Sequence, residues 1–233
     1  MTAVTAYARR FGLVYFVLAA VVGAAIGATI VLASRGGHSR SPWSEWRPTA
    51  AAEFRTKEIA NRVAAAYRLR NGKPLVDVVT GAPFQSVVTE IATPAIGAGF
   101  GSDTPVYDPS RTRMFVLCGA GKNCSLPGIP TVARTQLLRR EALELALYTF
   151  KYVDTDAVVE FLPGGAKARP NLALFFRRHE VAPFLSSPLR TTLPRKPQPS
   201  TAQRIDQLTL SHIFRFTLQP SQAGGGLLVL DRG

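Results

Sequence analysis

The longest apolar stretch of the chain lies close to its N-terminus. Residues 11–33 contain no charged side chain, and only three glycines and one threonine interrupt the apolar residues. A bilayer core of roughly 30 Å is crossed by about 20 helical residues. The pattern therefore predicts a transmembrane helix over residues 11–33, preceded by a short tail of residues 1–10. A cleaved signal peptide is the alternative, but its apolar part is usually about 7–15 residues long.

Residues typical of a membrane boundary flank this segment. They are Arg9, Arg10, Arg35, Trp43 and Trp46. Positive charges are nearly balanced between the two sides, so the charge balance alone does not decide the orientation of the helix. Two arginines directly precede the helix, and long domains are translocated largely regardless of charge. Both favour a cytoplasmic N-terminus and an extracytoplasmic domain, and hence a single-pass protein of the cell membrane. The alternative for the two tryptophans is packing onto the folded domain.

Small residues form a stripe along the predicted membrane helix. Such a face lets a second helix approach closely. We expect it to contact a partner transmembrane helix or a second copy of the chain, besides the lipid bilayer; the alternative is that it faces lipid. The stripe consists of Ala19, Ala20, Gly23, Ala24, Gly27 and Ala28.

Beyond the apolar stretch, the pattern becomes that of a soluble domain. Residues 34–50 are rich in Ser, Gly, Arg and Pro and predict a juxtamembrane linker. Apolar residues at helical spacing predict a helix over 51–70, and a wider apolar arc predicts the central helix over 131–152. Short runs of β-branched and aromatic residues predict strands over 75–79, 85–92, 113–118, 158–162, 172–176, 213–218 and 227–230.

The C-terminal part of the chain contains a proline-rich segment and a hairpin. Residues 183–201 include five prolines and predict an extended strap on the domain surface. Residues 212–231 predict a hairpin around three consecutive glycines, and we expect it to join the main sheet because an isolated hairpin is marginally stable in water. Residues 51–233 then form one domain of the α+β class. The whole chain is predicted to be an N-terminal transmembrane helix followed by a mixed α/β globular domain with an antiparallel-rich sheet and two main helices.

The chain is strongly basic, with 28 Lys and Arg against 15 Asp and Glu and a net charge of +13. Residues 34–72 carry eight basic and three acidic groups, and residues 183–205 carry four basic groups and no acid. We expect these segments to meet anionic lipid or an acidic partner. Nucleic acid is the least favoured partner, because motifs and interleaved aromatic residues typical of its binding are missing. Arginine exceeds lysine by 22 to 6, and this bias is typical of a GC-rich bacterial genome.

The two cysteines, Cys118 and Cys124, stand six positions apart on either side of a turn. Paired strands bring Cα atoms within the roughly 4.4–6.8 Å that a disulfide requires. A structural disulfide is expected if the domain lies outside the cytoplasm, and two reduced thiols if it lies inside. The spacing matches neither a redox motif nor a zinc site.

Catalytic motifs are not found in the sequence, and no cofactor or metal is expected. The Gly119–Lys122 segment lacks the spacing of a phosphate loop. Asp154, Asp156 and Glu160 follow the long helix and are compatible with a catalytic carboxylate pair, although a solvated turn is the simpler interpretation. Arg177–His179 is compatible with anion binding, and its simpler interpretation is an ordinary surface.

These observations favour a non-catalytic membrane-anchored envelope protein that acts as an accessory or assembly subunit of a membrane complex. Two alternatives stay open. One is an envelope enzyme that acts on wall polymer or lipid through the acidic group of residues 154–160. The other is a cytoplasm-facing basic domain that tethers nucleic acid to the membrane.

Overall fold

The computed structural model describes residues 42–69, 71–81, 86–94, 104–165, 169–194, 199–222 and 224–232. The described residues from Trp43 onward belong to one compact unit. The predicted tail, residues 11–33 with their small-residue stripe, and Arg9, Arg10 and Arg35 lie outside the described residues.

One eight-stranded mixed sheet organises the domain. The strands follow each other in the order β1-β4-β5-β6-β7-β8-β2-β3, with β1 and β3 at the edges. The pairs β4–β5 and β2–β8 are parallel, and the other five are antiparallel. The strands are β1 Asp77–Thr80, β2 Val88–Ala92, β3 Val106–Tyr107, β4 Thr112–Cys118, β5 Ala157–Phe161, β6 Leu172–Arg177, β7 Ile213–Pro220 and β8 Gly226–Asp231.

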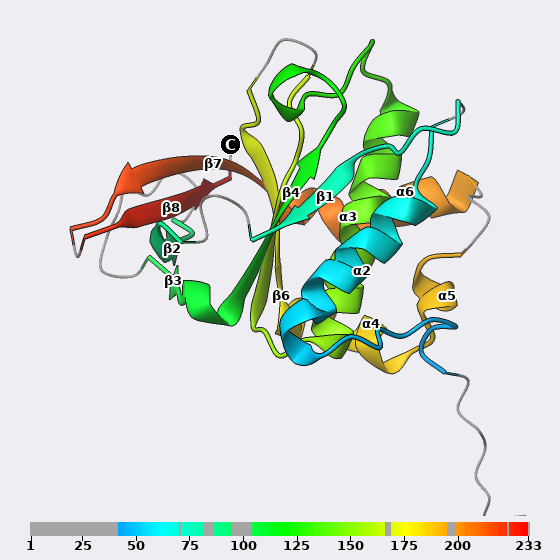
Figure 1. The fold of residues 1–233 in the computed structure, drawn as a ribbon, viewed down its shortest axis with the longest axis horizontal. Coiled ribbons are helices and arrows are strands. Elements are labelled where there is room, and N and C mark those ends of the chain that lie inside the picture. The colour runs from blue at the N-terminus through cyan, green and yellow to red at the C-terminus, as the bar shows by residue number, and fades with distance from the viewer. Residues whose placement is uncertain are drawn as a thin grey trace, which may run out of the picture. The chain divides into compact units, whose positions relative to one another are not determined.

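Helices cover one face of this sheet, while its other face curls toward β2, β3 and β8 (Figure 1). The central helix α3, Val132–Tyr152, lies between β4 and β5 in the chain and forms the crossover connection that this parallel strand pair requires. The α-helices are α2 Ala52–Ala66, α3 Val132–Tyr152, α4 Arg178–Ser186, α5 Leu189–Thr192 and α6 Pro199–Thr209, and the 3₁₀ turns are η1 Pro109–Arg111, η2 Lys122–Cys124 and η3 Leu210–His212.

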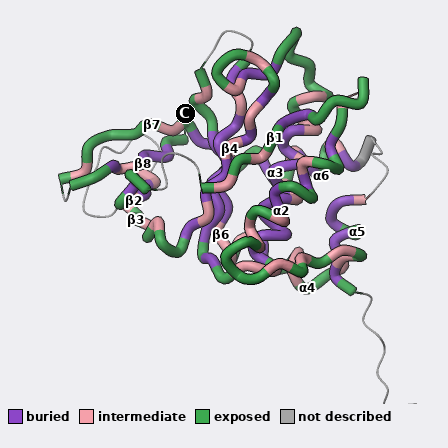
Figure 2. Tube along the Cα trace, viewed as in Figure 1, coloured by how far each residue is buried: buried purple, intermediate pink, exposed green. Residues whose placement is uncertain are grey.

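Two separate apolar clusters stabilise the domain, one on each face of the sheet. In the first, Ile59 and Val63 of α2 and Leu145 of α3 pack with Phe115 and Phe176 of the sheet. The second lies inside the curl, where residues of β4, β5 and β6 meet residues of β7, β8 and β2. Both faces of the sheet are therefore covered in its middle, and Figure 2 shows that buried residues are concentrated there. All five residues of β5 are buried for this reason.

The fold class expected from the sequence needs correction. The described residues form a mixed α/β domain with a single mixed sheet, and five α-helices rather than two main ones accompany it. Within the described residues, no helix is both long enough and apolar enough to cross a membrane. The longest of them, α3, has 21 residues, but charged side chains occur along its length.

Most of the described residues in the segment expected to form an extended strap are helical. Pro183 lies inside α4, α5 follows Pro188, and α6 begins at Pro199. Proline is compatible with the start of a helix because the N–H it lacks has no partner there, and this applies to Pro188 and Pro199. Pro183 lies beyond the first turn of α4, and this reason does not apply to it. The C-terminal hairpin is present as β7 and β8, and β8 joins the main sheet by pairing with β2 as well.

Both tryptophans of the expected linker pack onto the domain. Trp43 is buried and its indole N–H donates to the carbonyl of Phe184 at 2.9 Å. Its ring meets that of Tyr148 edge to face at 5.1 Å, and Trp46 meets the same ring at 5.3 Å. The second interpretation of these residues is therefore the one the structure shows, and the compact unit begins at Trp43.

Candidate functional site

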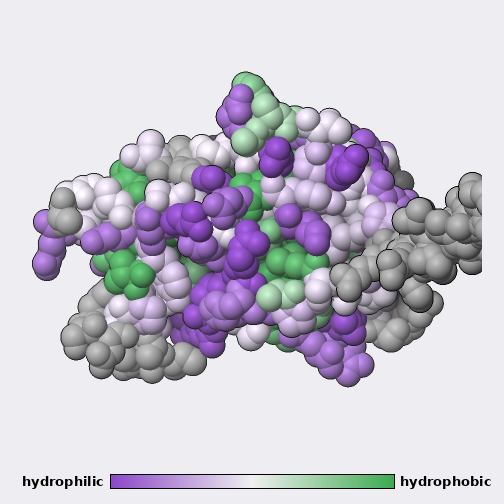
Figure 3. Space-filling view, turned by 90° about the horizontal axis from the view of Figure 1, so that it is seen from below, coloured by the Kyte–Doolittle hydropathy of each residue, from purple (hydrophilic) through white to green (hydrophobic). Residues whose placement is uncertain are grey.

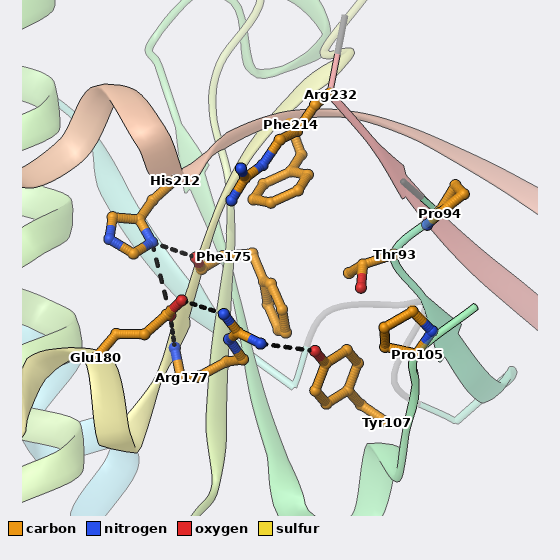
Figure 4. Close-up of a pocket in the computed structure, with 10 residues that line it drawn as sticks. All are labelled: Thr93, Pro94, Pro105, Tyr107, Phe175, Arg177, Glu180, His212, Phe214 and Arg232. Carbon is orange, nitrogen blue, oxygen red and sulfur yellow. Dashed lines mark hydrogen bonds and ion pairs between the residues drawn. The ribbon is translucent and has the colours of Figure 1, made fainter. Parts of the chain in front are cut away.

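A pocket of about 470 Å³ opens at one end of the curled sheet. Strands β6 and β8 end there, β7 begins there, and the end of β2 and the start of β3 form the opposite wall. This placement follows from topology: β8 and β2 are parallel, and β7 is antiparallel to both β6 and β8. The mouth of a curled or closed sheet is a common position for a ligand site. Figure 4 shows the side chains that line the pocket.

A hydrogen-bonded arginine forms the centre of the charged wall. Arg177, the last residue of β6, donates to the hydroxyl of Tyr107 at 3.1 Å and forms an ion pair with Glu180. The backbone N–H of Arg177 also donates to Glu180 at 2.9 Å, so this carboxylate caps the first turn of α4. Burial opposes ionisation of Glu180, but the bonds from Arg177 outweigh it and lower its pKa. Arg177 is thereby held in one orientation.

His212 borders the same wall. Its Nδ1 lies 3.0 Å from the carbonyl oxygen of Phe175 and 3.8 Å from Glu180 (Figure 4). A carbonyl oxygen only accepts, so Nδ1 carries the hydrogen and donates. Burial lowers the pKa of His212 in spite of the neighbouring carboxylate. The imidazole is therefore neutral at neutral pH.

Arg232 supplies a second cation from the residue after β8. Its guanidinium lies over the ring of Phe214 at 5.0 Å from the ring centre. It has no carboxylate partner among the described residues. Arg177 and Arg232 contribute two positive charges and Glu180 one negative charge, so the pocket carries a net charge of +1 with neutral His212.

The rest of the lining is mainly apolar. Phe175 and Phe214 meet edge to face with ring centres 5.9 Å apart, and Tyr107 meets Phe175 at 5.1 Å. Pro94 and Pro105 lie across from these rings in Figure 4. Aromatic floors with a few fixed polar groups are typical of pockets that bind small organic molecules. The arrangement is suited to binding an anion that also carries an apolar group.

The cysteines predicted to pair do so. Cys118 ends β4, Cys124 lies in η2, and the two form a disulfide with Cα atoms 4.3 Å apart. The turn between them is held by the Gly119 N–H, which donates to the carbonyl of Cys124 at 3.0 Å. The disulfide belongs to the opposite end of β4 from η1 and contributes no residue to the pocket.

The acidic group of residues 154–160 does not form one site. Asp154 and Asp156 are exposed and both bind Arg111, at 3.2 and 2.9 Å. The hydrogen bond from Arg111 lowers the pKa of Asp156. Glu160 is fully buried under α3 instead, within electrostatic reach of Glu141. No group of three or more metal-binding side chains occurs in the part of the chain that the structure describes.

The sequence identified one residue of the pocket and missed the others. Of the Arg177–His179 segment, only Arg177 lines the pocket. Arg178 donates to three carbonyl groups in the last turn of α3 and the residues just after it, and His179 is exposed. Tyr107, His212 and Arg232 come from distant parts of the chain, and nothing in their local sequence distinguishes them.

Comparisons of the chain with protein-family models, with curated proteins and with solved structures found no match.

Proposed function

We propose that the chain acts without catalysis as a ligand-binding accessory subunit in the cell envelope, with its domain outside the cytoplasm. The pocket at the mouth of the curled sheet carries this proposal. It combines a hydrogen-bonded arginine, a second arginine without a carboxylate partner among the described residues, and an aromatic floor. These features suit recognition of a small molecule.

The disulfide supports the location. Structural disulfides persist in oxidising compartments and are rare in the cytosol. Cys118 and Cys124 are bonded, and the described residues include no free cysteine.

The two alternative functions have less support. An enzyme that uses the carboxylates of residues 154–160 would need them close together, whereas Asp156 is exposed and Glu160 is buried. For a nucleic-acid tether, Arg111, Arg139 and Arg178 are not available, because they bind acidic side chains or carbonyl groups within the fold. Figure 3 shows hydrophilic side chains across one face with apolar groups in separate patches.

Filling the pocket tests the proposal. Thr93→Phe places a ring in the wall beside Pro94 and Pro105. We expect small molecules that bind the full-length chain to lose at least about tenfold in affinity in this variant, because their space is occupied. Ligand-observed NMR with a mixed set of anionic, neutral and cationic fragments measures the effect.

Val106→Phe is the matched control. Val106 is next to Tyr107 in β3, is exposed, and lies on the opposite side of the strand because side chains alternate. We expect normal binding in this variant. If no fragment binds the chain, or if Thr93→Phe binds as well as the unsubstituted chain, the proposed function is wrong.

A further inference from the structure

We propose that the ligand of the pocket is a monocarboxylate with a compact apolar body, such as an aryl- or alkyl-carboxylic acid. This inference rests on the proposed binding function and adds the chemical class of the ligand. It depends on the charges that face the pocket, on which of their hydrogen-bond donors are already used, and on the apolar surface beside them.

The charges of the pocket match one negative charge. Glu180 offsets Arg177 through their ion pair, which leaves Arg232 as the cation whose charge no carboxylate of the described residues offsets. A cationic ligand would meet two guanidinium groups, and a dianion would leave part of its charge unmatched. Arg232 is exposed to solvent, and a group of charge −1 that pairs with it brings the net charge of the pocket to zero.

The donors also favour a planar carboxylate over a phosphate. A guanidinium presents its N–H groups in a planar fork that pairs with the two oxygens of a carboxylate. Phosphate sites typically add backbone N–H groups at a helix N-terminus. Here the N-terminus of α4 borders the pocket, but the side chain of Glu180 already accepts from the backbone there. The carboxylate of Glu180 would also repel the second charge of a phosphate.

The apolar part of the ligand has a defined surface to contact. Phe214 lies directly beneath the guanidinium of Arg232, and Phe175 lies between Phe214 and Tyr107. A carboxylate bound to Arg232 therefore places its carbon chain or ring against these aromatic side chains. Burial of that apolar surface adds to the affinity roughly in proportion to its area.

Four probes test the chemical class of the ligand. Three have nearly the same shape but differ in charge, and the fourth is an anion without an apolar part. Phenylacetate, phenylacetamide, 2-phenylethylamine and inorganic phosphate are each titrated into the full-length chain at pH 7, and binding is followed by ligand-observed NMR and calorimetry. We expect phenylacetate to bind at least about fivefold more tightly than the amide, since a charge-assisted hydrogen bond replaces a neutral one. We expect the amine and phosphate to bind more weakly still.

Arg232→Gln removes the cation without removing the aromatic floor. We expect it to weaken phenylacetate about fivefold to tenfold and to leave phenylacetamide nearly unchanged. Arg215→Gln is the matched control, because Arg215 is exposed and adjacent to Phe214 in β7, so its side chain lies on the other face. It makes the same change in net charge away from the pocket.

The possible results separate this inference from the proposed function. If phenylacetamide or 2-phenylethylamine binds as tightly as phenylacetate and Thr93→Phe abolishes that binding, the pocket binds ligands but the carboxylate assignment is wrong. If phosphate binds most tightly, the assignment is also wrong. Equal losses in Arg232→Gln and Arg215→Gln would mean that the effect comes from net charge alone, and this too overturns the assignment.

Discussion

Two glutamate side chains are buried in the core between α3 and the sheet. Glu141 of α3 and Glu160 of β5 are both fully buried. The carboxyl oxygens of both side chains have no hydrogen-bond partner within the described part of the chain. Burial raises the pKa of Glu141 to about 9, and the charges of Glu144 and Asp77 add to this effect. Burial also raises the pKa of Glu160 well above its usual range, with Glu141 adding to it. Both groups are therefore protonated in the folded domain at neutral pH.

This pair predicts a domain that loses stability as the pH rises. Between about pH 4.5 and 9 Glu141 has lost its proton in the unfolded chain but keeps it in the folded domain. Glu160 acts in the same direction, because burial raises its pKa as well. The free energy of unfolding should therefore decrease by up to about 1.4 kcal/mol per pH unit for each group. Glu160→Met should remove the contribution of this glutamate and raise the free energy of unfolding at pH 8 by about 1–4 kcal/mol. Urea denaturation at pH 5 to 9 measures both effects.

Glu160→Gln is a more conservative companion, and Glu53→Gln is its control. Glu53 lies on the exposed side of α2, so its substitution should leave the pH dependence unchanged. Glu160→Gln should flatten the decrease between pH 5 and 8. An unchanged pH dependence in both Glu160 variants would show that this glutamate is ionised in the folded domain and that the account given for the pair is wrong.

The turn after β4 leaves no room for a side chain at Gly119. A Cβ added at Gly119 would lie 2.3 Å from the backbone oxygen of Ser125. The disulfide between Cys118 and Cys124 and the bond from the Gly121 N–H to Ser125 at 2.8 Å hold the two arms of the turn at this separation. The backbone cannot move apart without breaking these links.

Gly119→Ala should therefore destabilise the domain by about 1–3 kcal/mol, the usual cost of overpacking. Gly165→Ala is the matched control, because a Cβ at Gly165 meets no atom within 4 Å. We expect that variant to differ from the unsubstituted domain by less than about 0.5 kcal/mol. Thermal and urea unfolding under oxidising conditions compare the two, and equal stabilities would contradict the packing argument.

For the molecule as a whole, the disulfide leads to a prediction about location. An alkaline phosphatase fused after Gly233 should be active in cells, and a fluorescent protein fused at the same point should be dark, because the domain is proposed to lie outside the cytoplasm. Alkylation of intact cells should leave Cys118 and Cys124 unlabelled until a reductant is added. Inactive phosphatase, a bright fluorescent fusion and labelled cysteines would place the domain in the cytoplasm and contradict the proposal.

Local features of the domain could largely be predicted from the sequence. The central helix was expected at 131–152 and α3 spans Val132–Tyr152, because its apolar arc repeats at helical spacing. Seven of the eight strands overlap expected ones, since short β-branched and aromatic runs mark them. The short β3 was missed because two residues between Pro105 and Pro109 carry no such pattern. The disulfide was predicted because its cysteines are close along the chain.

The sequence by itself determined the local structure: the periodic helices, most strands and the disulfide turn, all of which depend on residues near each other in the chain. Only the tertiary structure decided the curl of the sheet, the pocket and the burial of Glu160. Tyr107 and Arg177 are 70 positions apart, and they meet because β2, β3 and β8 fold over β6. Glu160 lies four residues after exposed Asp156, but it is buried because α3 covers that face of β5. Such contacts depend on the packing of distant elements, which local periodicity does not encode.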